Sequence, residues 1–153
     1  MLEIKDLSIS INGRYLVKNL NLVLNRGDKL AIIGEEGNGK STLLKTILGK
    51  GEYIEVSGSI NFKNNRIGYL EQSINEKDLD KNGYDFLFIN EIDYYNNLNN
   101  LYKYLNLIHL SDEILKQRIK TLSGGEKVKI SILKLLLNEY DILFLDEPTN
   151  DLD

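Results

Sequence analysis

The stretch GEEGNGKST, residues 34–42, combines glycines, a lysine and two hydroxyl side chains at a fixed spacing. Gly34, Gly39, Lys40 and Ser41 fit the pattern G-x-x-x-x-G-K-[ST]. Glycines let the backbone turn its N–H groups inward around a chain of phosphates, and a following helix adds its positive N-terminal end. The stretch therefore predicts a nucleotide phosphate site, and the competing interpretation is a glycine turn with a solvated lysine.

Three side chains of this loop have expected tasks. Lys40 is expected to act as a catalytic residue that reaches the β- and γ-phosphates as a point charge. The Ser41 hydroxyl is expected to ligate Mg²⁺. Thr42 is expected to support the α-phosphate. The predicted nucleotide-binding residues of the loop are Gly34, Glu35, Glu36, Gly37, Asn38, Gly39, Lys40, Ser41 and Thr42.

Two acids, Asp146 and Glu147, follow the apolar run ILFL. A phosphate loop needs a second acid that holds Mg²⁺ through water at the end of a neighbouring strand, and Asp146 is placed for that task. Glu147 is then expected to face the γ-phosphate, where it would orient or deprotonate the attacking water as a catalytic residue. Solvated acids at a capped strand end are the alternative interpretation.

A second glycine motif, LSGGEK, begins at Leu122. Ser123, Gly124 and Gly125 precede a long helical pattern, so they predict another anion-binding helix N-terminus with a hydroxyl donor. Taken alone, the same residues are equally well explained as an ordinary helix cap.

The elements that must position these residues follow from periodicity. Apolar residues alternate from Met1 to about Leu24 around the turn NGR, which predicts antiparallel strands. A short buried strand is expected at 30–33, and then a helix that ends at Gly49. The segment VSGSINFKNNRIGYLEQ predicts another pair of short strands. Residues 84–119 predict a helical block, and the run ILFL predicts a buried strand.

A further helix is expected after LSGGE. Alternating strands and helices indicate an α/β fold with parallel pairing.

The composition is that of a globular domain: 153 residues, 42% hydrophobic and 27% charged. A net charge of −4 disfavours a generally basic nucleic-acid binder, and the absence of cysteine excludes disulfides. No apolar stretch in the sequence is long enough to predict direct membrane insertion.

The order of motifs GEEGNGKST, YLEQ, LSGGEK and ILFLDEPTNDLD resembles the ATP-binding cassette (ABC) family over essentially the whole chain. The resemblance implies a P-loop NTPase-type core with an N-terminal antiparallel β subdomain. A small helical subdomain would occupy about 82–121 of a single nucleotide-binding domain, 1–153. The family's further C-terminal strands would be missing, so a fragment of a longer cassette protein is expected.

The resemblance also implies roles for residues outside the phosphate loop. Gln72 would sense the γ-phosphate and Mg²⁺, as a catalytic residue and a metal ligand beside Ser41 and Asp146. Asp153 would contact a second cassette, either in a homodimer or in a tandem chain. ATP would be sandwiched between the two cassettes, gripped in trans by the signature residues Leu122, Ser123, Gly124, Gly125 and Glu126.

The forms LSGGE and DEPTN-x-LD are similar to the ABC-F branch, which is cytoplasmic and acts on the ribosome. The implied function is an ATPase that converts ATP and water to ADP and phosphate with Mg²⁺. Two alternatives stay open: the ATP-binding subunit of a membrane transporter, whose partner is a permease, and a non-catalytic nucleotide-binding fragment. The isolated chain's own hydrolysis is left open.

The chain departs from the family pattern where an aromatic residue usually stacks on adenine. Ile11 aligns with that position, and Tyr15 follows four residues later as the candidate for the base contact. The histidine that usually contacts the γ-phosphate would follow residue 153. The single histidine, His109, lies before LSGGEK and is expected to be structural.

Overall fold

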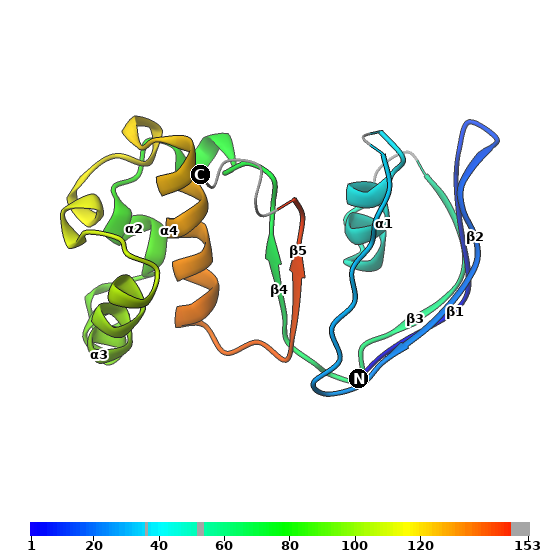
Figure 1. Cartoon of the computed structure of the whole chain (residues 1–153), viewed down its shortest axis with the longest axis horizontal. Coiled ribbons are helices and arrows are strands. Elements are labelled where there is room, and N and C mark those ends of the chain that lie inside the picture. Colours follow the sequence, from blue (N-terminus) through cyan, green and yellow to red (C-terminus); the bar gives the residue numbers. More distant parts are fainter. Residues whose placement is uncertain (36, 52–53, 148–153) are drawn as a thin grey trace. The chain divides into compact units, whose positions relative to one another are not determined.

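The computed structural model describes residues 1–35, 37–51 and 54–147, in two compact units, Met1–Arg66 and Ile67–Asp153. The elements of the first unit are β1 (Leu2–Ile11), β2 (Arg14–Leu24), α1 (Lys40–Ile47) and β3 (Glu55–Asn61). Those of the second unit are β4 (Ile67–Leu70), η1 (Glu76–Asp78), α2 (Gly83–Leu87), α3 (Glu91–Leu107), η2 (Asp112–Lys116), η3 (Ile119–Thr121), α4 (Gly124–Leu137) and β5 (Ile142–Leu145) (Figure 1).

The first unit is built on an antiparallel sheet of order β2-β1-β3 (Figure 1). Asn12 and Gly13 join β1 to β2 with positive φ angles of 49° and 76°, the conformation that a two-residue hairpin turn requires. The central strand, β1, carries the buried apolar side chains of this sheet: Leu2, Ile4, Leu7 and Ile9. The antiparallel prediction for the N-terminal segment is confirmed.

Helix α1 begins directly after the glycines of the phosphate loop, as predicted. It ends in a Schellman motif, in which the Gly49 N–H donates to the Thr46 carbonyl and the Lys50 N–H to the Lys45 carbonyl. Gly49 has a φ of 70°, which a residue with a side chain adopts at a cost. The prediction that Gly49 terminates this helix is confirmed.

The predicted strand at 30–33 is wrong. These residues have no regular secondary structure, and Leu30, Ile32 and Ile33 have 52%, 40% and 93% of their surface exposed. An extended segment becomes a strand only when a neighbour pairs with its backbone groups. In the part of the first unit that the structure describes, β1, β2 and β3 pair only with one another.

The second unit contains the parallel pairing that the sequence predicted. Strand β4 runs parallel to β5, and Tyr69 is opposite Phe144 in their register. The two short strands expected in the middle of the chain, β3 and β4, do form, but they belong to different sheets. Strand β5 was expected to be buried, yet Leu143 and Leu145 are each 49% exposed and Phe144 is the one buried residue of this strand. The reason is that the described part of this sheet has two strands.

Helix α4 contacts β4 on one side and α2 and α3 on the other (Figure 1). The helical block predicted at 84–119 is confirmed as α2, α3 and the 3₁₀ turns η2 and η3. Its apolar core has α4 as one wall and consists of Phe86, Leu87, Phe88, Leu101, Leu105, Ile114, Leu115, Ile119, Leu122, Ile130 and Leu133. Among the helices that the structure describes, none has the length and apolar character that crossing a bilayer requires.

Two leucines of α3 allow a matched test of this core. Leu101 is fully buried, whereas Leu107 on the same helix is 65% exposed. We expect Leu101→Ala to lower the free energy of unfolding by about 2–5 kcal/mol, because it removes buried methylene groups and leaves a cavity. Leu107→Ala should change it by less than about 0.5 kcal/mol. Urea unfolding of both variants measures the difference, and equal effects would contradict the observed packing.

Candidate nucleotide site

The phosphate loop of the first unit is an irregular segment that leads into the N-terminus of α1. Gly39 is the residue before the helix and has a φ of 82°, and Gly37 has a φ of 79°. Both angles lie in the left-handed region that glycine adopts without strain. The structure describes every predicted loop residue except Glu36, which lies outside the described residues.

Lys40 closes this loop through its side chain. Its Nζ donates hydrogen bonds to the carbonyl oxygens of Gly34, at 2.9 Å, and of Glu35, at 3.0 Å. Both ends of the predicted loop are therefore tied together by the ammonium group. Because Lys40 is the first residue of α1, its charge adds to the positive N-terminal end of the helix. Ser41 and Thr42 follow in the first turn.

The start of β2 lies against the end of the loop. A Cβ atom on Gly39 would come within 3.2 Å of Leu16 Cδ1, so the side chain of Leu16 is what meets the loop here. Tyr15 is 58% exposed, and the Lys18 Nζ lies 5.4 Å from the centroid of its ring. The contact of Tyr15 with an adenine base stays a prediction.

The acidic pair of the second unit follows β5. Asp146 is only 3% exposed, and its backbone N–H donates to the Leu70 carbonyl of β4 at 3.1 Å. The Tyr69 hydroxyl donates a hydrogen bond of 3.0 Å to Asp146 Oδ2. Burial, and then the hydrogen bond to Asp146, raises the pKa of Tyr69 above its ordinary value.

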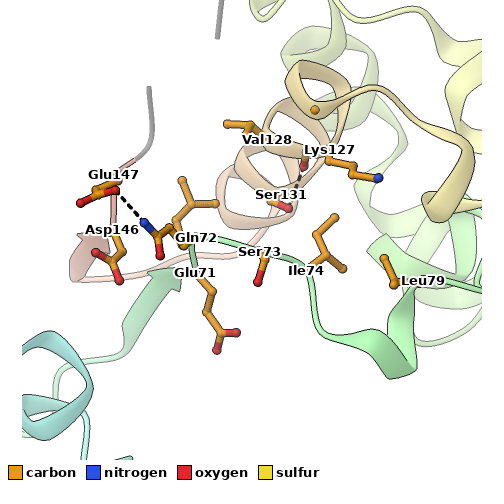
Figure 2. Close-up of a pocket in the computed structure, with 12 residues that line it drawn as sticks. Glu71, Gln72, Ser73, Ile74, Leu79, Lys127, Val128, Ser131, Asp146 and Glu147 are labelled. Carbon is orange, nitrogen blue, oxygen red and sulfur yellow. Dashed lines mark hydrogen bonds between the residues drawn. The ribbon is translucent and has the colours of Figure 1, made fainter. Parts of the chain in front are cut away.

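Gln72 and Glu147 form a second polar pair. The Gln72 Nε2 donates to Glu147 Oε2 at 2.6 Å (Figure 2). Glu147 has a φ of 47°, a left-handed conformation that is uncommon for a residue with a side chain and that occurs often at functional sites. The acidic pair after ILFL predicted Glu147 and the family resemblance predicted Gln72, and the structure brings the two side chains into direct contact.

A cleft of about 510 Å³ opens beside these pairs. It lies between the segment after β4, the segment after β5 and the first turns of α4 (Figure 2). Three predicted catalytic or metal-binding residues line it together with one signature glycine. The lining residues are Leu70, Glu71, Gln72, Ser73, Ile74, Leu79, Gly124, Lys127, Val128, Ser131, Asp146 and Glu147.

The signature residues form the N-terminus of α4. Leu122 is buried in the helical core, and Ser123 is the N-cap. Ser123 and Glu126 make a complete capping box: the Ser123 N–H and Oγ each lie 2.9 Å from Glu126 Oε2, and the Glu126 N–H donates to Ser123 Oγ. The helix-cap interpretation of this motif is therefore confirmed, and its role toward an anion stays a prediction.

The motif order and the sites just described agree with a known family. A family model described as ABC transporter matches residues 17–150. The chain belongs to the ABC transporter family. The matched residues include Ser41, Gln72, Ser123, Asp146 and Glu147 of this ATP-binding cassette.

Three curated relatives are similar over 99% of the chain. The cassette is 39% identical to the ribosome protection protein VmlR of Bacillus subtilis (strain 168) and 35% identical to the ATP-binding protein Uup of Buchnera aphidicola subsp. Acyrthosiphon pisum (strain APS). It covers 27% and 26% of their lengths, so it spans about a quarter of these relatives. It is also 34% identical to the zinc import ATP-binding protein ZnuC of Buchnera aphidicola subsp. Baizongia pistaciae (strain Bp), of which it covers 62%.

Solved structures agree with the fold. A putative ABC transporter ATP-binding protein from Pyrococcus furiosus superposes with a TM-score of 0.79 at 25% identity, over 99% of this chain and 78% of that one. The dimeric bacterial ABC transporter cassette MJ0796 superposes with a TM-score of 0.78 over 100% of this chain and 76% of that one. Its 20% identity supports the fold alone. The P-loop NTPase-type α/β fold is thereby confirmed.

Each half of the predicted site is defined within its own unit. The first unit holds the loop residues 34–42 and Tyr15, and the second gathers Gln72, Asp146 and Glu147 around one cleft. Asp153, the predicted contact to another cassette, lies outside the described residues. The roles of the predicted residues and the boundaries of the helical subdomain stay predictions.

One residue of the site was missed by the sequence reasoning. Tyr69 begins the YLEQ motif, and no task was assigned to it although Gln72 of the same motif was recognised. The alternation of side chains along a strand points to it. Tyr69 is opposite Phe144 in the parallel register, and Asp146 lies two residues beyond Phe144, on the same side of the sheet. Recognising it needed that register, which the sequence alone does not supply.

The capping box of α4 supports a prediction on stability. Hydrogen bonds from the backbone and then the side chain of Ser123 hold the pKa of Glu126 below its ordinary value. Because the folded pKa is depressed, this stabilisation is present above the unfolded value and is lost as the pH falls through the folded pKa. We expect Ser123→Ala to lower the free energy of unfolding by about 0.5–2 kcal/mol at neutral pH, and by less in acid.

Chemical denaturation at pH 7 and at successively lower pH values measures this loss. Ser131→Ala is the control, because Ser131 lies inside α4 and donates to the Lys127 carbonyl, where alanine is a better helix former. A Ser123→Ala effect that is negligible at pH 7, or that grows in acid, would contradict the role of the capping box.

Proposed function

We propose that this cassette binds Mg-ATP and hydrolyses it to ADP and phosphate. The observation that carries the proposal is the cleft of the second unit, where the buried Asp146 and the hydrogen-bonded pair of Gln72 and Glu147 lie together. A buried carboxylate beside a second carboxylate and an amide supplies oxygen ligands and a base. Membership of the ABC transporter family supports ATP as the nucleotide.

The first unit provides the phosphate-binding half of this proposal. Lys40 would exchange its bonds to the Gly34 and Glu35 carbonyls for bonds to the β- and γ-phosphates. Main-chain N–H groups of the loop and of the first turn of α1 would bind the remaining phosphate oxygens. Lys40 and these N–H groups would thus hold the phosphates in place and neutralise their charge. Positioning and charge neutralisation supply much of the acceleration in phosphoryl transfer.

The donor set fits Mg²⁺. The candidate ligands are the Ser41 hydroxyl, the Gln72 amide oxygen and the Asp146 carboxylate, all hard oxygen donors of the kind that this cation prefers. Among the described residues, no three acids, histidines or cysteines gather in the way a dedicated protein cage would need. That agrees with a cation held largely by water and phosphate. When bound, Mg²⁺ would neutralise charge on the β- and γ-phosphates.

Glu147 is proposed as the catalytic residue that orients the attacking water and accepts its proton. Its hydrogen bond to Gln72 keeps the carboxylate at the edge of the cleft. Gln72 would couple this carboxylate to the presence of the γ-phosphate, because its amide can bind either the carboxylate or a ligand. The phosphoryl group would pass to water, and the ADP oxygen would leave with the charge that Lys40 stabilises.

A second cassette would complete the site. Ser123 and the glycines after it form a helix N-terminus with a hydroxyl, a suitable partner for the γ-phosphate of another cassette. Solved cassettes with this fold include dimers, one of them with ADP and Pi. ATP hydrolysis should therefore rise more steeply than linearly with protein concentration, or require a partner cassette. Strictly linear dependence would contradict the sandwich.

The ribosome is the proposed target of the whole protein, which would act in the cytoplasm. VmlR, 39% identical, is named a ribosome protection protein, and this similarity favours the translation branch. ZnuC, a zinc import ATP-binding protein that is 34% identical, favours the alternative of a transporter subunit that works with a permease. Co-sedimentation of the protein with ribosomes, compared with its co-purification with a membrane protein, distinguishes the two.

Titration with Mg-ATP tests the nucleotide-binding part of the proposal. The amide resonances of residues 34–42 should shift on addition of Mg-ATP, since their N–H groups would receive the phosphates. Titration with magnesium chloride alone is the control. Unchanged amide resonances in folded protein at millimolar Mg-ATP would overturn the proposed function.

A further inference from the structure

Tyr69 and Asp146 lie on the same face of the β4–β5 pair. Tyr69 is opposite Phe144 in the parallel register. Paired residues of neighbouring strands point to the same side, and Asp146 follows Phe144 by two residues, so it continues that side beyond the strand. This arrangement brings the Tyr69 hydroxyl to 3.0 Å from Asp146 Oδ2.

The main chain of Asp146 is bonded to β4 as well. The Asp146 N–H donates to the Leu70 carbonyl, the residue next to Tyr69. One strand, β4, thus contacts both the main chain and the side chain of Asp146. With only 3% of the residue exposed, a carboxylate at this site has little water to replace a lost hydrogen bond.

We propose that Tyr69 is a positioning residue that fixes the rotamer of Asp146 and so sets how its carboxylate is presented to the Mg²⁺ of bound ATP. This inference rests on the proposed function, because it concerns the same nucleotide site. Outer-shell hydrogen bonds of this kind orient the groups around a metal, and their loss weakens metal binding about 10- to 100-fold. Gln72 Nε2 donates to Glu147, whereas the Tyr69 hydroxyl donates directly to Asp146.

The Tyr69→Phe variant tests the proposal, since it removes the hydroxyl and keeps the ring. Binding of a fluorescent ATP analogue is measured as Mg²⁺ is titrated, and again in EDTA. We expect the Mg²⁺ concentration at half-saturation to rise about tenfold, with binding in EDTA unchanged. A purely structural hydroxyl would lower the melting temperature without moving the Mg²⁺ requirement, and that result would overturn the proposal.

Tyr84→Phe is the matched control. Tyr84 is half-buried, and its contact is an edge-to-face packing of its ring with Tyr94 at 5.5 Å, which does not need the hydroxyl. The Tyr84→Phe variant should have the same Mg²⁺ concentration at half-saturation as the wild type. A wild-type protein that fails to bind Mg-ATP at all would instead refute the proposed function, so the two failures are distinguishable.

A second measurement needs no substitution and applies even if Tyr69→Phe does not fold. In the wild-type protein, the ring carbon that bears the Tyr69 hydroxyl is followed by NMR during titration with ATP in EDTA and with Mg-ATP. It should shift with Mg-ATP and stay in place with metal-free ATP, while the Tyr84 resonance shifts in neither. Identical Tyr69 responses to both titrations would overturn the positioning role.

Discussion

Glu147→Gln will reduce ATP hydrolysis by about 10²–10⁴-fold and leave ATP binding in place, because the amide cannot accept the proton of the attacking water. Glutamine has the same shape as glutamate, so its side-chain oxygen can still accept the 2.6 Å hydrogen bond from Gln72 Nε2. The substitution therefore removes the base and keeps the contact. The loss of hydrolysis is measured as the rate of phosphate release at saturating Mg-ATP. The full-length protein is used for this measurement.

Glu76→Gln serves as the control for this substitution. Glu76 is an exposed acid in η1, and the same chemical change there should leave the hydrolysis rate as in the wild type. ATP affinity of Glu147→Gln should stay within about threefold of the wild type, since the phosphate contacts assigned to the loop of the first unit are untouched. A variant that hydrolyses ATP at the wild-type rate would remove Glu147 from the mechanism.

Much of the local structure was predictable because its causes are local. The Asn12–Gly13 turn, the Gly49 helix end and the Ser123–Glu126 capping box each depend on residues a few positions apart. Glycine or asparagine at a positive φ and a serine with glutamate three residues later are readable from the sequence. The sequence predicts the turn and the helix end, and it offers the cap as one of two interpretations of LSGGEK.

The pairing of distant strands was harder to predict, because it depends on partners rather than propensity. The apolar run at 30–33 has the composition of a buried strand, yet the described part of its unit offers it no pairing partner. Leu143 and Leu145 are equally apolar and are half exposed for a related reason. Hydrophobic pattern gives a segment its preference, and neighbouring backbone decides whether the preference is realised.

The candidate site divides in the same way. The motif spacing gave Lys40, Ser41, Asp146 and Glu147 their expected tasks, and Gln72 came from the family resemblance. The structure adds the contacts between them in the second unit. It also adds Tyr69, whose relevance depends on a register between residues 77 positions apart in the chain.

Lys40→Ala will weaken Mg-ATP binding by at least about 100-fold. A hydrogen bond between charged groups contributes about 1.5–3 kcal/mol, and every 1.4 kcal/mol is a factor of ten in affinity. Lys40 would contact two phosphates, which offsets the bonds to Gly34 and Glu35 that it gives up. Those two bonds are exposed to water, so their loss costs little by comparison.

Two further variants separate charge from shape at this position. Lys45→Ala removes an exposed lysine from the last turn of the same helix and should change ATP affinity by less than about twofold. Lys40→Arg keeps the charge but replaces a compact ammonium with a wide planar group, and we expect it to restore little of the affinity. Isothermal titration of the three variants measures these constants. The carbonyl oxygens of Gly34 and Glu35 accept hydrogen bonds from the one ammonium group of Lys40, at 2.9 and 3.0 Å, which is a geometry fitted to lysine. If Lys40→Arg bound ATP with the affinity of the wild type, charge alone would drive binding.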